Sequence, residues 1–272
     1  MKNFKLLSIL NLTAFLFHLI LAIFSNVKGV LSNNTVADIS HKYETIFAPA
    51  GITFSIWGVI YIFLLGFCMY HLYKAFSKSD TDQANIDTLS IGWLFLINNL
   101  ATGFWLIAWV NDRILLTVFL ILIQLLTLLL INLKLRVFNV HNSLIQKFLT
   151  QFPLSIYFAW ICIATIANIS AFLASTGWSS TGASAVYCTI GITIIATLVS
   201  VFTVIKRQNV FFGLVVIWAF YGIILKNQHF DPLTYGSVLK TLWICLGIVG
   251  ATTVNQCFKN EIKENSGFEI GC

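Results

Sequence analysis

Long apolar runs alternate with short polar segments along the whole chain. Each run approaches the roughly 20 residues that a helix needs to cross about 30 Å of hydrocarbon. We therefore expect about eight transmembrane segments. The pattern places them near 4–26, 52–73, 89–110, 114–133, 152–174, 184–205, 210–226 and 237–257.

The spans are expected to be helices. A segment in lipid must satisfy its own backbone polar groups, which only helices and closed β-barrels achieve. Barrel strands alternate apolar and polar residues over about ten positions, whereas the run from Leu125 to Ile131 is apolar except for Thr127. The first run follows Lys2 and Lys5 and exceeds a signal-peptide core of about 7–15 residues, so we interpret it as the first span. The sequence thus predicts an all-α integral membrane protein.

The composition agrees with this prediction. Hydrophobic residues make up 58% of the 272 residues and charged residues only 10%. In a soluble domain, about a quarter of all residues are charged. Most of the 16 Lys and Arg residues fall on the side of the N terminus, which predicts that both termini are cytoplasmic. Short loops and this asymmetry are typical of a bacterial inner membrane protein. The net charge of +6 gives no indication of nucleic-acid binding.

The predicted spans contain no carboxylate, although the chain has ten. Buried acids usually mark ion, proton or substrate pathways, so a coupled transporter that uses one is disfavoured. The sequence also shows no catalytic triad, no paired carboxylates and no C-x-x-C pair, so we expect no catalytic or metal site. His18 and His71 are the residues within spans that could ligate a haem iron, but a packing role is favoured for both.

The aromatic residues, 8 Trp, 8 Tyr and 24 Phe, are the feature of the sequence that indicates a function. Trp93 and Trp178 lie near span ends, where tryptophan usually anchors a helix to the membrane interface. Trp57, Trp105 and Trp160 lie inside spans beside small or polar neighbours. Such rings, together with a few neutral hydrogen-bonding groups, are suited to a pocket for a flat and largely apolar ligand.

Two segments carry a resemblance to a known family. In the first, Phe47-Ala48-Pro49-Ala50-Gly51-Ile52-Thr53-Phe54-Ser55-Ile56-Trp57-Gly58-Val59-Ile60-Tyr61, the residues Pro49, Trp57 and Tyr61 correspond to a Pro-Pro-x-Trp-x-Phe segment followed by Trp-x-x-x-Tyr. Ala50 and Ile52 depart from that pattern. The segment resembles the second helix of the tryptophan-rich sensory protein family, also called the TspO or translocator protein (peripheral benzodiazepine receptor) family, in its longer bacterial branch.

The second segment is similar to the fifth helix of that family, Tyr-x-x-Trp-x-x-x-Ala-Thr-x-x-Asn. Trp160, Ala164 and Asn168 are spaced by four residues, so they lie on one helix face. The third span resembles the family only loosely. The positions that match in these two spans are Tyr157, Trp160, Ala164, Thr165 and Asn168 in the fifth, and Asn98 and Trp105 in the third.

The resemblance covers roughly residues 4–174 and implies a five-helix bundle within 1–176. Three additional transmembrane helices would occupy 177–258, and a cytoplasmic polar tail would occupy 259–272. The additional helices could cover a face that shorter members use to dimerise. A homodimer is therefore kept as one possible assembly of this chain.

The function that the resemblance implies is a membrane binding or sensory protein for a flat hydrophobic ligand, with a tetrapyrrole such as protoporphyrin expected and no required cofactor. Some members are described as degrading porphyrin in light, but no residue pattern here supports catalysis, so enzymatic activity is left open with the balance towards none. A small-molecule permease or exporter and a ligand-free assembly partner are the alternatives. The ligand-binding residues expected are Pro49, Trp57, Tyr61, Asn98, Trp105, Tyr157, Trp160, Ala164 and Asn168.

Overall fold

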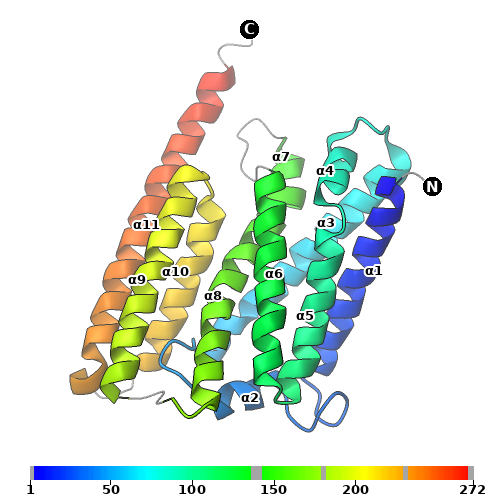
Figure 1. Ribbon diagram of the computed structural model, residues 1–272. Coiled ribbons are helices and arrows are strands. Elements are labelled where there is room, and N and C mark those ends of the chain that lie inside the picture. Colours follow the sequence, from blue (N-terminus) through cyan, green and yellow to red (C-terminus); the bar gives the residue numbers. More distant parts are fainter. Residues whose placement is uncertain (1–2, 136–142, 179–181, 229–231, 269–272) are drawn as a thin grey trace.

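The computed structural model describes residues 3–135, 143–178, 182–228 and 232–268, and these ranges are built from helices and short connections. Figure 1 shows the long helices side by side in an up-and-down arrangement, with the start of α1 and the end of α11 at the same end. The helices are α1 Asn3–Phe24, α2 Val36–Lys42, α3 Ile56–Ser77, α4 Gln83–Ile91, α5 Leu94–Val110, α6 Ile114–Lys134, α7 Leu144–Gln146, α8 Phe152–Ser175, α9 Gly182–Lys206, α10 Val210–Asn227 and α11 Pro232–Phe268. A 3-10 helix, η1 Gly51–Ser55, leads into α3, and a π-helix, η2 Lys147–Gln151, leads into α8.

The number of membrane spans agrees with the prediction. In the described ranges, seven helical segments are long and apolar enough to cross a membrane, and the bent pair α4 and α5 provides an eighth span. The expectation of an all-α membrane protein with about eight spans is therefore confirmed. The lipid explains the many large apolar side chains on the outside of the bundle, since the outward faces of the helices meet hydrocarbon rather than water.

The third predicted span needs a correction. We expected one helix over 89–110, but α4 ends at Ile91 and α5 begins at Leu94, with a bend of 57° between them. Gly92 has a φ of 56°, a left-handed conformation that glycine adopts without a steric penalty. This residue ends α4 and turns the chain into α5.

The helices form two groups, and α10 makes the main contacts between them. In the first group α1 packs on α3 and α5, α5 packs on α6, and α6 packs on α8. In the second group α9 and α11 pack together, and both contact α10, which packs on α8. The expected boundary at 176 falls between the groups. The expected tail from 259 starts inside α11, and residues 269–272 lie outside the described residues.

His71 joins three elements at the end of the bundle where α1 begins. Its Nδ1 lies 2.9 Å from the hydroxyl of Thr88 in α4, and its Nε2 lies 3.0 Å from the hydroxyl of Thr150 in η2. The residue is 3% exposed. Both ring nitrogens therefore have protein partners, which supports the packing role that the sequence favoured over haem ligation.

Candidate functional site: an aromatic cavity at one end of the bundle

A cavity of about 720 Å³ lies at the end of the bundle opposite the start of α1. It is bounded by the last turns of α1, by α2, by the segment that enters α3 and by the second half of α5. Its volume falls within the range of roughly 300–1,000 Å³ that is typical of small-molecule sites. The lining residues are Leu19, Ala22, Ile23, Ser25, Asn26, Val36, Ala37, Ser40, His41, Glu44, Ala48, Pro49, Ala50, Gly51, Phe54, Trp57, Tyr61, Thr102, Trp105, Leu106 and Lys226.

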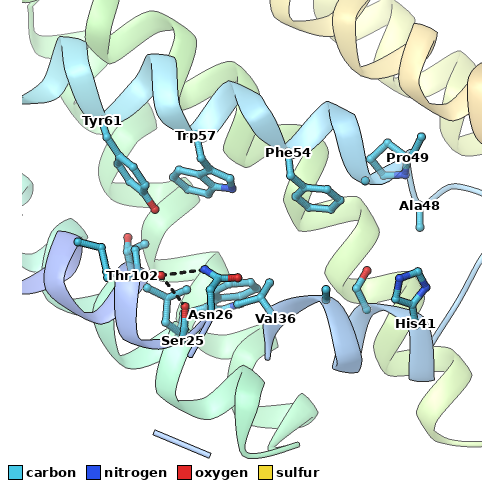
Figure 2. Close-up of a pocket in the computed structure, with 18 of the residues that line it drawn as sticks. Ser25, Asn26, Val36, His41, Ala48, Pro49, Phe54, Trp57, Tyr61 and Thr102 are labelled. Atoms are coloured by element: carbon cyan, nitrogen blue, oxygen red, sulfur yellow. Dashed lines mark hydrogen bonds between the residues drawn. The ribbon is translucent and has the colours of Figure 1, made fainter. Parts of the chain in front are cut away.

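One wall of the cavity is aromatic. Figure 2 shows Tyr61 and Trp57 of α3, Phe54 of η1 and Pro49, which precedes η1, in a row. Trp57 and Tyr61 stack with ring centroids 5.3 Å apart and planes 28° apart. Because successive turns of α3 carry these rings, they form a continuous apolar surface on which a flat molecule can lie.

The opposite wall is more polar and comes from the end of α1, the turn that follows it and α2. Ser25, Asn26, Val36 and His41 face the aromatic row across the gap (Figure 2). The Ser25 hydroxyl and the Asn26 amide both donate to the carbonyl of Ala22, at 2.9 Å each. These bonds close the end of α1, so the hydrogen-bond donors of Ser25 and Asn26 are used within this helix ending.

Four of the nine expected ligand-binding residues line this cavity, and the others do not. Those that line it are Pro49, Trp57, Tyr61 and Trp105. Tyr157, Trp160, Ala164 and Asn168 of α8 and Asn98 of α5 are outside the lining.

Two residues of α8 stand directly behind the aromatic wall. Trp160 is 2% exposed and its ring meets the Trp57 ring edge to face, with centroids 6.4 Å apart. Tyr157 is fully buried, lies 5.9 Å from Trp57 between ring centroids, and shares a 2.8 Å hydrogen bond with the Thr102 hydroxyl. Trp160 therefore supports Trp57 from behind, and Tyr157 supports both Trp57 and Thr102.

Asn168 reaches the cavity through Trp105. The indole nitrogen of Trp105 donates to the Asn168 side-chain oxygen at 2.8 Å, and the Asn168 amide donates to the Thr117 hydroxyl at 2.9 Å. The Trp105 ring also stacks on Trp109, with centroids 5.1 Å apart. This chain of contacts fixes the orientation of the Trp105 ring, so Asn168 positions a lining residue. Ala164 is partly buried and packs against the main core.

Asn98 lies away from the cavity and connects two helices. Its amide donates to the carbonyl of Gln124 at 3.1 Å and to the hydroxyl of Thr127 at 2.9 Å, both in α6. Hydrogen bonds of this kind commonly hold membrane helices together. The structure thus gives Asn98 a packing role between α5 and α6.

His18 contacts the lining residue Tyr61 but does not itself line the cavity. It is fully buried, its Nδ1 lies 3.1 Å from the side-chain oxygen of Asn99, and its Nε2 lies 3.5 Å from the Tyr61 hydroxyl. Both ring nitrogens again have protein partners, as for His71. In the part of the chain that the structure describes, no group of three or more His, Cys, Asp or Glu side chains could hold a metal ion.

Charged residues at the mouth of the cavity were missing from the sequence prediction. Lys226, near the end of α10, forms an ion pair with Glu44 at 3.0 Å and donates to the carbonyl of Thr45 at 3.1 Å. Both charged residues line the cavity. Nothing in the local sequence pairs them, because they lie at distant positions that only the packing of α10 brings together.

The packing of α10 against the segment that enters α3 explains this placement. The carbonyl of Gly222 accepts from the Ala50 amide at 3.0 Å, and the Trp218 indole donates to the carbonyl of Thr53, also at 3.0 Å. The Asn227 amide donates to the carbonyl of Ile46 at 2.9 Å. A segment that contributes several lining residues is thus held by the second helix group.

The α2 wall is stabilised at its first turn. The Thr35 hydroxyl accepts from the Asp38 amide at 3.2 Å, and the Asp38 carboxylate accepts from the Thr35 amide at 2.8 Å, which is a capping box. The Thr35 amide, and after it the Lys28 ammonium 3.1 Å away, lower the pKa of Asp38 to about 2. The carboxylate is therefore ionised at neutral pH and keeps α2 in position.

The comparisons with known proteins give one match. A family model described as TSPO-like protein matches residues 8–255, which is most of the chain and includes all eight spans in whole or in part. Neither the search of curated proteins nor that of solved structures finds a match.

Proposed function

This chain belongs to the family of TSPO-like proteins, and we propose that its cavity binds a flat, largely apolar small molecule, with a porphyrin as the leading candidate. Family membership supports a membrane binding or sensory protein in general. The finer statement, which names the class of ligand, rests on the chemistry of the cavity.

The row of Phe54, Trp57 and Tyr61 is the observation that carries the proposal. Aromatic faces favour stacking on a planar ring system, and contacts between aromatic pairs contribute about 0.5–1.5 kcal/mol beyond burial. The Trp105 ring, fixed by Asn168, supplies a further aromatic surface in the same cavity. A few polar side chains of the lining, such as those of Asn26 and Ser40, are available to orient the ligand.

The position of the cavity favours binding over passage across the membrane. Its lining residues in α1, α3 and α5 all come from the half of each helix that lies away from the start of α1. Beyond Tyr61, the side chains of His18, Leu64 and Phe67 are buried and fill the bundle. A permease, the alternative function, would need a second conformation in which these buried side chains move apart. Vesicle flux assays separate the two proposals.

Under the orientation expected from the Lys and Arg distribution, the cavity opens to the non-cytoplasmic side of a bacterial inner membrane. Figure 1 places α2, which walls the cavity, at the end of the bundle opposite the start of α1. A reporter enzyme that is active only in the cytoplasm, fused to the C terminus, tests this orientation.

The experiment for ligand binding is a titration of purified protein with protoporphyrin IX, followed by the porphyrin absorbance. Wild type is compared with Trp57→Leu and with Trp243→Leu, a matched control because Trp243 is 54% exposed on α11. We expect saturable binding to wild type and the control, and about tenfold weaker binding to Trp57→Leu, since the loss of one aromatic contact costs about 1.4 kcal/mol. Equal affinity in all three proteins would reject this site.

A further inference from the structure

The ion pair at the mouth of the cavity is asymmetric. The Lys226 side chain is 15% exposed, whereas that of its partner Glu44 is 53% exposed. The ammonium is therefore shielded and belongs to a long helix, while the carboxylate projects from a loop towards solvent. Of the described residues that line the cavity, Lys226 is the one lysine or arginine.

The position of Lys226 is fixed independently of Glu44. The next residue, Asn227, bonds to the carbonyl of Ile46, and one helical turn earlier Gly222 accepts from the amide of Ala50. The Lys226 ammonium also donates to the carbonyl of Thr45. The ammonium would thus stay at the cavity mouth if the Glu44 side chain moved away.

A shielded ammonium needs an anionic partner, because removing a charge from water without compensation is costly. Ion pairs with an exposed partner, in contrast, contribute only about 0–1 kcal/mol. Replacing Glu44 by another carboxylate would therefore cost little, and the displaced Glu44 would be hydrated by solvent. A ligand whose carboxylate takes this place gains a charge-assisted hydrogen bond.

We propose that the cavity selects amphipathic carboxylates: the flat apolar part of the ligand lies along Trp57 and Tyr61, and its carboxylate replaces Glu44 on Lys226. This inference rests on the proposed function and adds the class of ligand. It also gives the second helix group a part in recognition, because Lys226 belongs to α10.

The test compares protoporphyrin IX, a dicarboxylate, with its uncharged dimethyl ester. Each is titrated into wild type, Lys226→Gln, Lys226→Arg and Glu44→Gln, with Lys240→Gln, an exposed lysine of α11, as the matched control. We expect Lys226→Gln to weaken binding of the free acid about tenfold and to leave the ester unchanged. Lys226→Arg should retain most of the affinity, and Glu44→Gln should strengthen binding of the acid because the competing carboxylate is gone.

Several outcomes would overturn the inference. If Lys226→Gln weakens the binding of the acid and of the ester equally, the lysine acts by maintaining the structure of the cavity mouth. Thermal melts of the variant would then show a loss of stability. If it changes neither ligand, the carboxylate is not recognised there, although the proposed function stands. If wild type binds neither ligand, both proposals fail.

Discussion

The indole rings of Trp57 and Trp160 meet edge to face, with centroids 6.4 Å apart and planes at 85°, yet only Trp57 lines the cavity. The two helices thus bring their tryptophans together, but in two layers. The layer on α3 is available to a ligand, and the layer on α8 supports it. Substitutions in the two layers should therefore have different consequences.

Trp160→Phe should reduce stability more than ligand affinity. Trp160 is 2% exposed, so a smaller ring leaves a void, and we expect the free energy of unfolding to fall by about 1–3 kcal/mol. The lower part of this range is favoured because the indole nitrogen is buried without a hydrogen-bond partner among the described residues. Detergent unfolding and porphyrin titration measure the two effects. A loss of affinity as large as that of Trp57→Leu would place Trp160 in contact with the ligand.

Asn168 and Trp105 should be energetically coupled. Their 2.8 Å hydrogen bond is lost in either Asn168→Ala or Trp105→Phe. The double variant should therefore lose less unfolding free energy than the sum of the losses in the two single variants. Couplings between polar side chains in membrane helices average about 0.6 kcal/mol and reach about 1.7. Unfolding of the four proteins in mixed micelles gives the coupling. Asn98→Ala removes a hydrogen bond to α6 instead. Its loss of unfolding free energy should simply add to that of Trp105→Phe, with no coupling between the two.

Gly222→Ala should loosen α10 from the segment that enters α3. A β-carbon at Gly222 would lie 2.7 Å from the Thr53 methyl carbon and 2.8 Å from its β-carbon, and closer still to its hydroxyl oxygen. We expect a destabilisation of about 1–3 kcal/mol from this overlap. The control is Gly247→Ala, because no atom lies within 4 Å of a β-carbon there. Thermal melts that are identical for the two variants would contradict the close packing at Gly222.

Asp38→Asn should destabilise the protein at neutral pH but not in acid. The pKa of Asp38 is about 2 in the folded protein, below its ordinary value of 3.8, so its contribution is present above the ordinary value. That contribution is lost as the pH falls from about 4 to about 2. Melting temperatures of wild type and variant across this range should converge at the acidic end. A difference that persists there would show that the carboxylate charge is not the cause.

The sequence predicted the membrane spans well because span prediction needs only the length and composition of apolar runs. It missed the interruption at Gly92, since a glycine within an apolar run can mark either close packing or a helix end. The short helix α2 was also missed, although the spacing of Thr35 and Asp38 is that of a capping box.

The expected site residues show what helical spacing can and cannot predict. Trp160, Ala164 and Asn168 follow the four-residue spacing of one face, but spacing alone does not tell which neighbour a face meets. All three lie outside the cavity lining, and Trp160 and Asn168 act on it through Trp57 and Trp105. The pairing of Glu44 with Lys226 was beyond prediction for a further reason, because it depends on how two helix groups pack.

The bonds from Gly222, Trp218 and Asn227 to the entrance segment have a practical consequence for anyone who shortens this protein. A chain that stops after α8 would retain the first helix group, but these three hydrogen bonds to the segment that enters α3 would be lost. Such a fragment should show a protease-sensitive loop near Pro49 even where the remaining helices stay intact. Helix α10 therefore stabilises the entrance of the cavity, although it lies outside the first helix group.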